Sequence, residues 1–290
     1  MTEKTVNLHT YFFRNLEFIY DIFRYDFLGN AFLACVLSGI TCGIIGTYIV
    51  ARRMVFLCGG ITHASFGGLG IAFYYGFDPL AGALCFAAIS SVGTEWASRR
   101  GRIREDSAIG IIWSVGMAVG ALFMTLRPGY ASDLTSYLFG SILLVDRTDI
   151  VFMTLLTVAV AAGAVLWIRP IMYMTFDNEY AASQGIRTER ISYIMAVVTA
   201  ITIVLSIKIM GIILLLSLLT MPVVIVNSVT KSYAAIAAWS AVVATAGNIA
   251  GFVLSYHLDI PTGSCIIFTF CAVLVIVKLL TLRRKQVAGA

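Results

Sequence analysis

The sequence predicts an all-α protein, a polytopic transmembrane helical bundle with eight or nine spans. Of its 290 residues, 60% are hydrophobic and only 12% are charged, whereas soluble domains have about 25% charged residues. Mean hydropathy is +0.93. Apolar runs long enough to cross about 30 Å of hydrocarbon recur from Phe27 to the C-terminus.

The runs divide into nine segments, of which two leave the count open. Residues 57–76 are rich in glycine and could cross the membrane only in part. Residues 191–227 could form one broken helix pair around Lys208 and Gly211, which would leave eight spans. The predicted segments are 28–50, 57–76, 79–97, 106–126, 149–168, 191–208, 210–227, 232–256 and 260–282.

We expect three regions along the chain. Residues 1–26 contain no uninterrupted apolar run of the signal-peptide kind, and their apolar side chains recur at helical spacing opposite charged ones. This pattern predicts an amphipathic helix at the membrane interface. Residues 27–283 form the membrane domain, and residues 284–290 form a cytoplasmic tail.

Basic residues indicate the orientation. If the nine spans alternate, the loops and tail after the first span place thirteen Arg and Lys residues at one side and only Arg127 and Arg147 at the other, so the first side is cytoplasmic. The net charge of +5 belongs to these loops and indicates no nucleic-acid partner. The six cysteines have no CxxC spacing and form no Cys/His cluster at the spacing of a zinc site, so we expect them to pack as small apolar groups without disulfides.

A histidine lies in the glycine-rich segment "GGITHASFGG", residues 59–68. On a helix, Gly59, His63 and Gly67 share one face, and Gly60 and Gly68 lie on the adjacent stripe. Small residues at this spacing let helices pack closely in a membrane, so His63 could be hydrogen-bonded across a tight seam. Ionisable residues in a bilayer also line ion paths, and imidazole is a common ligand of transition metals. Periodicity leaves both interpretations open.

Sequence motifs do not favour an enzyme. The chain contains no HExxH, no GxSxG and no second histidine within a helical turn of His63, so an intramembrane hydrolase has little support. It also contains no GxxxxGK[ST], the loop through which many ATPases bind phosphate.

A polar segment, residues 172–192, falls on the predicted cytoplasmic side. Asp177 can cap a short helix that runs through Glu179 and Ala182, and Gly185 suits its C-terminal end. The helix could fit a groove in a partner or could be an ordinary loop helix.

Five segments carry a resemblance to a known family. Together they indicate similarity to the membrane-permease subunits of bacterial ATP-binding-cassette importers for zinc, manganese and iron(II), the ZnuB-like permeases, which have the type II importer fold. The resemblance covers about residues 28–283. The segments are "GTYIVARRMVFLCGGITHASFGGLGIA" (46–72), "DLTSYLFGSILLV" (133–145), "FDNEYAASQGI" (176–186), "KIMGIILLLSLLTMPVVIV" (208–226) and "LDIPTGSCII" (258–267).

The resemblance implies a transport subunit and not an enzyme. A second copy of the chain would complete a homodimer with the ion path at its interface, in the lipid of the bacterial cytoplasmic (inner) membrane. A separate ATPase dimer would dock on a coupling helix at about residues 176–186, around Glu179, Ala182 and Gly185. An extracytoplasmic metal-binding protein would deliver the ion. No cofactor is expected to be bound permanently, and the zinc, manganese or iron ion is cargo.

The resemblance also implies roles for individual residues. The metal role of the family's motif histidine carries over to His63, but many relatives have Asp where this chain has Gly59, which leaves the choice of metal open. Asp259 and His257 are further metal candidates from their place at the outer end of the last helices, and not from the resemblance; His257 could instead be simply solvated at the interface. Asp259 could instead cap the helix that begins near Pro261.

The segment with Lys208 and Gly211 predicts a break between half-helices. Lys208 would then extend to the outer interface, and Pro222 would kink the next half-helix. Such breaks often line translocation paths.

Two other transport functions stay open. A permease for chelated iron or a cobalamin-like ligand would need a larger cavity and more spans. A proton-coupled secondary metal carrier would need carboxylates within the membrane. Apart from Asp106 and Asp149, which begin two of the predicted spans, Glu95 is the only acid inside them.

Overall fold

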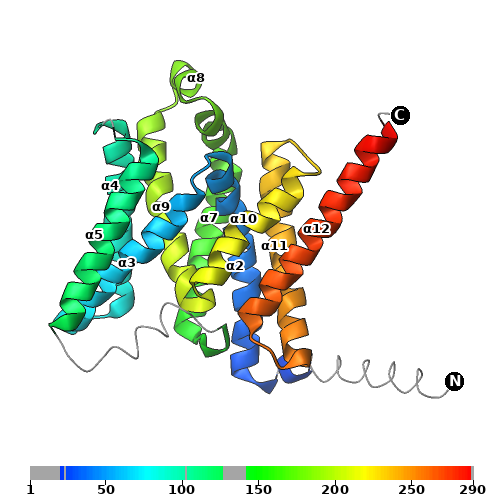
Figure 1. Cartoon of the computed structure of the whole chain (residues 1–290), viewed down its shortest axis with the longest axis horizontal. Coiled ribbons are helices and arrows are strands. Elements are labelled where there is room, and N and C mark those ends of the chain that lie inside the picture. Colours follow the sequence, from blue (N-terminus) through cyan, green and yellow to red (C-terminus); the bar gives the residue numbers. More distant parts are fainter. Residues whose placement is uncertain (1–19, 23, 102, 127–141, 289–290) are drawn as a thin grey trace.

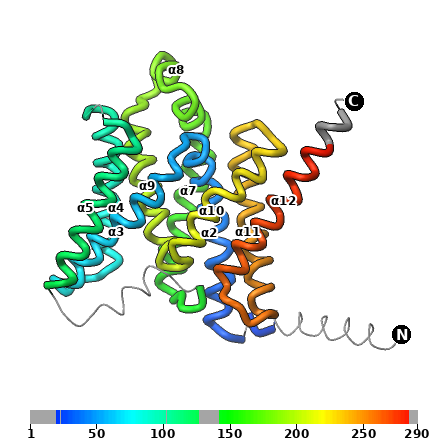
Figure 2. The backbone as a smooth tube through the Cα atoms, viewed as in Figure 1, coloured from blue at the N-terminus to red at the C-terminus, as the bar shows by residue number. Residues whose placement is uncertain are grey.

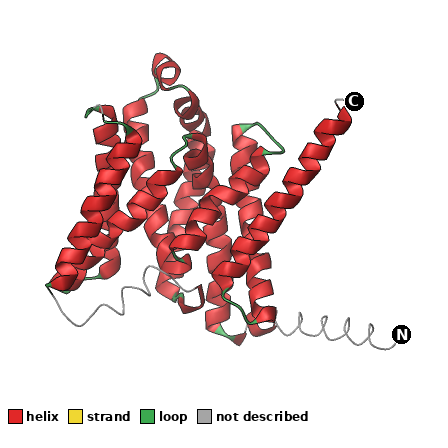
Figure 3. Cartoon of the chain, viewed as in Figure 1, coloured by secondary structure: helices red, strands yellow, loops and turns green. Residues whose placement is uncertain are grey.

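The computed structural model describes residues 20–22, 24–101, 103–126 and 142–288, and side chains up to residue 283. All regular elements in these ranges are helices, as Figure 3 shows. They are α2 (Asp26–Ala51), α3 (Val55–Tyr75), α4 (Pro79–Arg99), α5 (Glu105–Thr125), the 3-10 turn η1 (Ile142–Leu144), α7 (Arg147–Phe176), α8 (Asn178–Ser183), α9 (Thr188–Met210), α10 (Ile212–Asn227), α11 (Tyr233–Leu258) and α12 (Thr262–Ala288).

Eight of the described helices are long and apolar enough to cross a membrane. The exception among the apolar helices is α10, whose 16 residues extend over about 24 Å at 1.5 Å per residue. It follows α9 directly at Gly211, where the predicted break occurs. The structure thus combines eight long spans with one short returning helix.

The helices form neighbouring groups (Figure 1). In one group, α3 packs against α4 and α5 along glycine-rich faces. In the other, α2 contacts α7, α10 and α11, and α12 packs on α10 and α11. Helix α9 contacts α2, α7 and α10 of this second group, and its contact with α4 is the main connection to the first group. Figure 2 shows the last part of α12 leaning away from the bundle.

Carboxylates cap two of the long helices. The side chain of Asp78 accepts a hydrogen bond from the Ala81 amide at 2.9 Å, and Pro79 occupies the first turn of α4. The Asp146 carboxylate accepts from the Asp149 amide at 2.8 Å, and Asp149 accepts in return from the Asp146 amide. These caps satisfy amides that have no partner within the helix.

Two helices continue beyond their predicted ends. The prediction of 149–168 for the fifth span is too short, because α7 continues to Phe176. The helix is kinked before Pro170, because the backbone of Trp167 departs from helical geometry (φ −119°, ψ 19°). Such a kink is expected where proline removes a backbone donor. The last helix continues to Ala288, so most of the predicted tail, 284–290, extends α12.

Two predicted segments lie largely outside the described residues. The N-terminal interfacial helix was predicted over residues 1–26, of which the structure describes only 20–22 and 24–26. Residues 20–22 and 24 are helical, and Tyr25 separates them from α2. Of residues 133–145, only 142–145 are described, and they include the short turn η1.

Candidate functional site

His63 lies half-buried on α3 and faces α5. Its ring stacks on the indole of Trp113, with ring centroids 4.5 Å apart and ring planes only 6° from parallel. Within the described part of the chain, neither ring nitrogen of His63 forms a hydrogen bond, and neither is sealed inside the protein. The imidazole therefore has a fixed plane and open nitrogen atoms. Sequence periodicity predicted its helix face but not its aromatic neighbour.

The glycines around His63 have different surroundings. At Gly59, an added Cβ would meet only the Cζ3 atom of Trp113, at 3.9 Å, which is an ordinary contact. At Gly60, it would lie 2.5 Å from Cγ2 of Ile109 on α5. A side chain thus has room at Gly59, on the His63 face, but not at Gly60 on the adjacent stripe.

Gly67 and Gly68 lie where α3 meets two helices at once. A Cβ at Gly67 would be 2.8 Å from the carbonyl oxygen of Gly116 on α5. A Cβ at Gly68 would overlap the carbonyl oxygen of Gly82 on α4. Such close backbone approach is how helices associate in a membrane, so these glycines set the separation of α3, α4 and α5.

The other two metal candidates lie elsewhere. Asp259 has a left-handed backbone (φ 52°) at the C-terminal end of α11, so it does not cap the start of α12. His257 contacts Tyr256 edge to face, with ring centroids 5.6 Å apart. Figure 1 shows this end of α11 on the far side of α2 from α3. Among the described residues, no three His, Cys, Asp or Glu side chains come together as a metal site.

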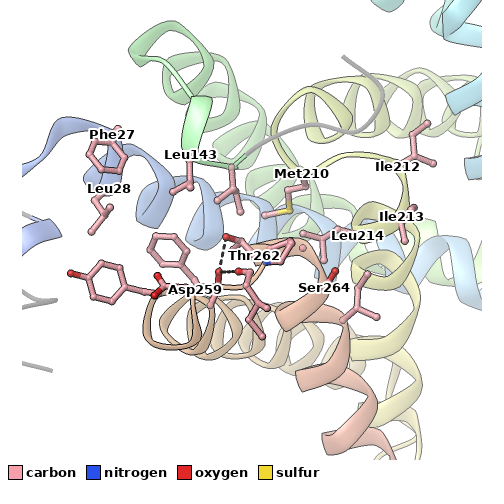
Figure 4. A pocket seen from close by; sticks show the side chains of 18 residues that line it. Phe27, Leu28, Leu143, Met210, Ile212, Ile213, Leu214, Asp259, Thr262 and Ser264 are labelled. Atoms are coloured by element: carbon pink, nitrogen blue, oxygen red, sulfur yellow. Dashed lines mark hydrogen bonds between the residues drawn. The ribbon is translucent and has the colours of Figure 1, made fainter. Parts of the chain in front are cut away.

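Asp259 lines a cavity of about 960 Å³ at the end of the bundle opposite α8. Figure 4 shows the cavity between the start of α2, the α9–α10 junction and the loop from α11 to α12. The buried Ser255 hydroxyl closes this loop by hydrogen bonds to the Ile260 carbonyl at 2.7 Å and the Thr262 hydroxyl at 2.9 Å. Apolar side chains, such as Met210 and Leu214, make up much of the lining.

The predicted coupling segment contains the short helix α8, which projects beyond its neighbours at one end of the bundle (Figure 1). Asp177 caps it by accepting a hydrogen bond from the Tyr180 amide at 2.9 Å. Gly185 follows with φ 77°, a left-handed conformation that glycine adopts without strain. Ala181 is buried, whereas Glu179, Ala182 and Gly185 are exposed, so one side of α8 anchors the loop and the other is open.

The helix break has the predicted glycine and an ion pair that was not predicted. Gly211 separates α9 from α10 with φ 76° and ψ 167°, and Pro222 is buried within α10. Lys208 does not simply extend to the interface, because its ammonium forms an ion pair with the carboxylate of Asp149 on α7. Only 6% of the Asp149 side chain is exposed, so the pair links α7 to α9 beside the break.

A second buried carboxylate links helices at the opposite end. Glu95 on α4 is 5% exposed, pairs with Arg99 one turn later and accepts a hydrogen bond from the Ser192 hydroxyl on α9. Nearby, Arg100 and Glu189 form an exposed pair at 3.0 Å between the same helices. Since α9 directly follows α8, these contacts connect the segment after α8 to the group that carries His63.

Comparisons with known proteins agree with this architecture. The ABC 3 transport family model matches residues 24–281. A probable metal transport system membrane protein of Thermotoga maritima is 34% identical over 256 residues, 87% of this chain and 89% of that protein. The manganese transport system membrane protein MntC of Halalkalibacterium halodurans is 31% identical over 254 residues, 87% of each chain.

Two solved structures have similar folds. PsaBC from Streptococcus pneumoniae, in complex with Fab, matches with a TM-score of 0.79 and 25% identity over 90% of this chain and 94% of that chain. An inward-facing putative metal-chelate type ABC transporter matches with a TM-score of 0.66 at 13% identity, which supports the fold alone. The family model covers most of the chain and the relatives align along nearly all of their own lengths. We conclude that the chain belongs to the ABC 3 transport family and is a multi-pass transport permease of the cytoplasmic membrane.

Proposed function

We propose that the chain is the permease subunit of an ATP-driven importer of a divalent transition-metal ion: zinc, manganese or iron(II). The observation that carries this proposal is His63, a half-buried imidazole with open nitrogen atoms on a membrane-spanning helix. Such a side chain suits a transition metal as ligand. The printed names of relatives support the same cargo class, since they include manganese and probable iron transport proteins.

The path would be completed by a second copy of the chain. The exposed surface of α5 supports this arrangement because it includes a stripe of small residues at helical spacing, beside the large apolar Ile111, Val115 and Leu122. Small residues suit helix packing in the membrane, and large apolar ones suit lipid. The small residues are Ser107, Gly110, Ser114, Ala118, Ala121 and Thr125. Trp113 lies on the flank of this stripe, so His63 would lie close to the interface.

Separate ATPase subunits would dock at the cytoplasmic end. The exposed side of α8, with Glu179, Ala182 and Gly185, supports this site because it projects beyond the helices around it. Movement of α8 would pass into α9, and from there through Ser192 and Glu95 into α4. A metal-binding protein would deliver the ion at the opposite, extracytoplasmic end, where Asp259 is exposed.

The chain itself would bind and pass the ion without making or breaking covalent bonds. A neutral imidazole donates a nitrogen lone pair to the cation, and two copies would present two such donors. ATP-driven closure of the partner subunits would alternate access to His63 between the two ends of the bundle. His257 and Asp259 lie at the extracytoplasmic end but on the far side of α2 from α3, so in this proposal they are outside the path that contains His63.

The test is uptake by the complex reconstituted in vesicles with its ATPase and binding protein. Zinc, manganese and iron(II) are offered with and without ATP, to wild type, to His63→Ala and to Phe268→Ala. Phe268 is a control because it is exposed on α12, a helix that packs on α10 and α11. We expect ATP-dependent uptake that falls at least about tenfold in His63→Ala, a loss of about 1.4 kcal/mol in cation binding.

Other outcomes would replace the proposal. Uptake that needs a proton gradient and not ATP would indicate a secondary carrier. Uptake of iron only as a chelate, or of a cobalamin-like ligand, would indicate a different cargo class. Unchanged uptake in His63→Ala would remove His63 from the path.

A further inference from the structure

Trp113 covers one face of the His63 ring and lies beside Gly59. The two rings are 4.5 Å apart and nearly parallel. One turn before His63, Gly59 leaves the edge of the indole only 3.9 Å from the place of a Cβ. The indole from α5 therefore lies over both His63 and the backbone of the preceding turn of α3.

This stacking restrains the imidazole without occupying its nitrogen atoms. The lone pairs that coordinate a metal lie in the plane of the ring, whereas Trp113 contacts the ring from above that plane. In most metal sites a hydrogen bond to the second nitrogen orients the histidine. Among the described residues no such bond to His63 is formed, so the indole is the group that restrains the ring plane.

The indole also suits the charge that the site acquires. When an imidazole binds a metal cation, the ring carries part of the positive charge. The face of tryptophan is the most electronegative among the aromatic side chains and attracts a cation within about 6 Å of its centre. The 4.5 Å separation is within this range. The cation-loaded ring is therefore held more tightly than the free ring.

Contacts other than that of Trp113 also hold α3 and α5 together. The seam between these helices is closed by backbone approach at other positions: a Cβ on Gly116 would lie 2.5 Å from the Cα of Ala64, and one on Gly70 would lie 2.8 Å from the carbonyl oxygen of Gly120. On α5, Gly116 lies about one helical turn beyond Trp113, and Gly120 lies about one turn further. The half-buried ring of Trp113 adds to a seam that is already closed.

We infer that Trp113 is a positioning residue for His63: its indole fixes the plane of the imidazole, leaves both nitrogens open to a divalent transition metal and stabilises the loaded ring. This inference rests on the proposed function, in which the cargo contacts His63. It adds a residue to that site that has no ligand atom of its own.

The first test is fluorescence quenching by Co²⁺ in the purified full-length chain. Trp96, Trp167 and Trp239 are replaced by Phe so that Trp113 alone emits, and a second protein retains Trp239 alone. Co²⁺ bound at His63 lies next to the indole and quenches it. We expect saturable quenching of Trp113, its loss in His63→Ala, and no saturable quenching of Trp239. Quenching that persists in His63→Ala, or no saturable quenching of Trp113, would overturn the inference.

The second test separates positioning from packing by comparing Trp113→Phe with Trp113→Leu in the uptake assay. Phe keeps an aromatic face that can stack, whereas Leu fills space without one. We expect Trp113→Leu to raise the KM for metal about tenfold, the lower range for the loss of a group that orients a ligand. The maximal rate and the melting temperature should change little. The KM of Trp113→Phe should be close to that of the wild type.

The outcomes distinguish this inference from the proposed function. If both variants have the wild-type KM while ATP-driven metal uptake continues, Trp113 does not position His63 and the transport function stands. If the wild-type complex takes up no metal, the proposed function fails, and the Co²⁺ titration still decides whether His63 and Trp113 form a cation site. Should Trp113→Leu fail to fold, Trp113→Met takes its place in the KM comparison, because methionine also fills space without an aromatic face.

Discussion

At the scale of single residues, the glycines of α3 serve two different purposes. Gly68 has no room for a side chain, because α4 approaches its backbone directly. Gly59 has room, with only the edge of Trp113 nearby. In the sequence both belong to stripes of small residues at the same spacing, and periodicity cannot show which stripe meets another helix.

This difference predicts opposite effects of adding one methyl group. Gly68→Ala should lower the free energy of unfolding by about 2 kcal/mol, the usual cost of overpacking a tight contact. Gly59→Ala is the matched control and should be neutral or slightly stabilising, because alanine favours the helix more than glycine does. Thermal unfolding of the purified chain in detergent measures both. Equal melting temperatures for the two variants would contradict the packing assigned to Gly68.

At the scale of elements, hydropathy located the spans well but not every end. The predicted span 28–50 corresponds to α2, which extends over Asp26–Ala51, and the predicted break near Gly211 separates α9 from α10. The fifth span was predicted to end at residue 168, because Arg169 and Pro170 interrupt the apolar run. The structure has a kink there, at Trp167, but a further helical segment continues α7 to Phe176. Hydropathy reports where a chain meets lipid, and a helix can continue beyond that region.

The ion pair between α7 and α9 predicts a conditional effect of mutation. Lys208→Met removes the ammonium from the buried Asp149 carboxylate and should cost about 3 kcal/mol of stability, as when one partner of a buried pair is lost. Adding Asp149→Asn removes the isolated charge and keeps an acceptor for the Asp146 amide. The double variant should therefore be more stable than Lys208→Met alone. Melting temperatures of the single and double variants test this coupling, and additive losses would contradict it.

The exposed side of α8 predicts uncoupling without unfolding. Glu179→Lys reverses a charge on that side, and uptake per ATP hydrolysed should fall about tenfold if docking loses about 1.4 kcal/mol. Val229→Ala is a control, since Val229 is exposed in the loop between α10 and α11 at the same end. Parallel measurement of ATP hydrolysis and metal uptake by the reconstituted complex checks the ratio. Normal coupling in Glu179→Lys would show that the ATPase docks elsewhere.

At the scale of the whole molecule, the sequence predicted the class of fold and the region of the site, but not the contacts between distant residues. His63 and Trp113 lie on different helices, as do Lys208 and Asp149. Each pair depends on the separation and rotation of packed helices. Small residues set both through contacts between helices, and the periodicity of the sequence does not show which helices those contacts join. His63 itself was predictable, because a histidine in an apolar, glycine-rich span is conspicuous. Its stacking partner was not, because a tryptophan in a span usually faces lipid or the core.

The two ends of the bundle differ in charge, and this difference predicts the orientation of the whole chain. Near α8, the described ends and loops carry Arg52, Arg53, Arg99, Arg100, Arg104, Arg187, Arg190 and Lys231. At the other end the described basic residues are Arg24, Arg147 and Lys208, beside Asp21, Asp26, Asp78, Asp146, Asp149 and Asp259. Basic residues stay on the cytoplasmic side, so α8 should face the cytoplasm and the loop after α11 the exterior.

A thiol reagent that does not cross membranes tests this orientation in intact cells. The background is Cys85→Ser, because Cys85 is the exposed cysteine of the described structure. Ile260→Cys, in the exposed loop before α12, should react in intact cells. Ser183→Cys, at the end of α8, should react only after the cells are made permeable. Reaction of Ser183→Cys from outside would place α8 on the wrong side for a cytoplasmic ATPase, and the coupling role of Glu179, Ala182 and Gly185 would then be excluded.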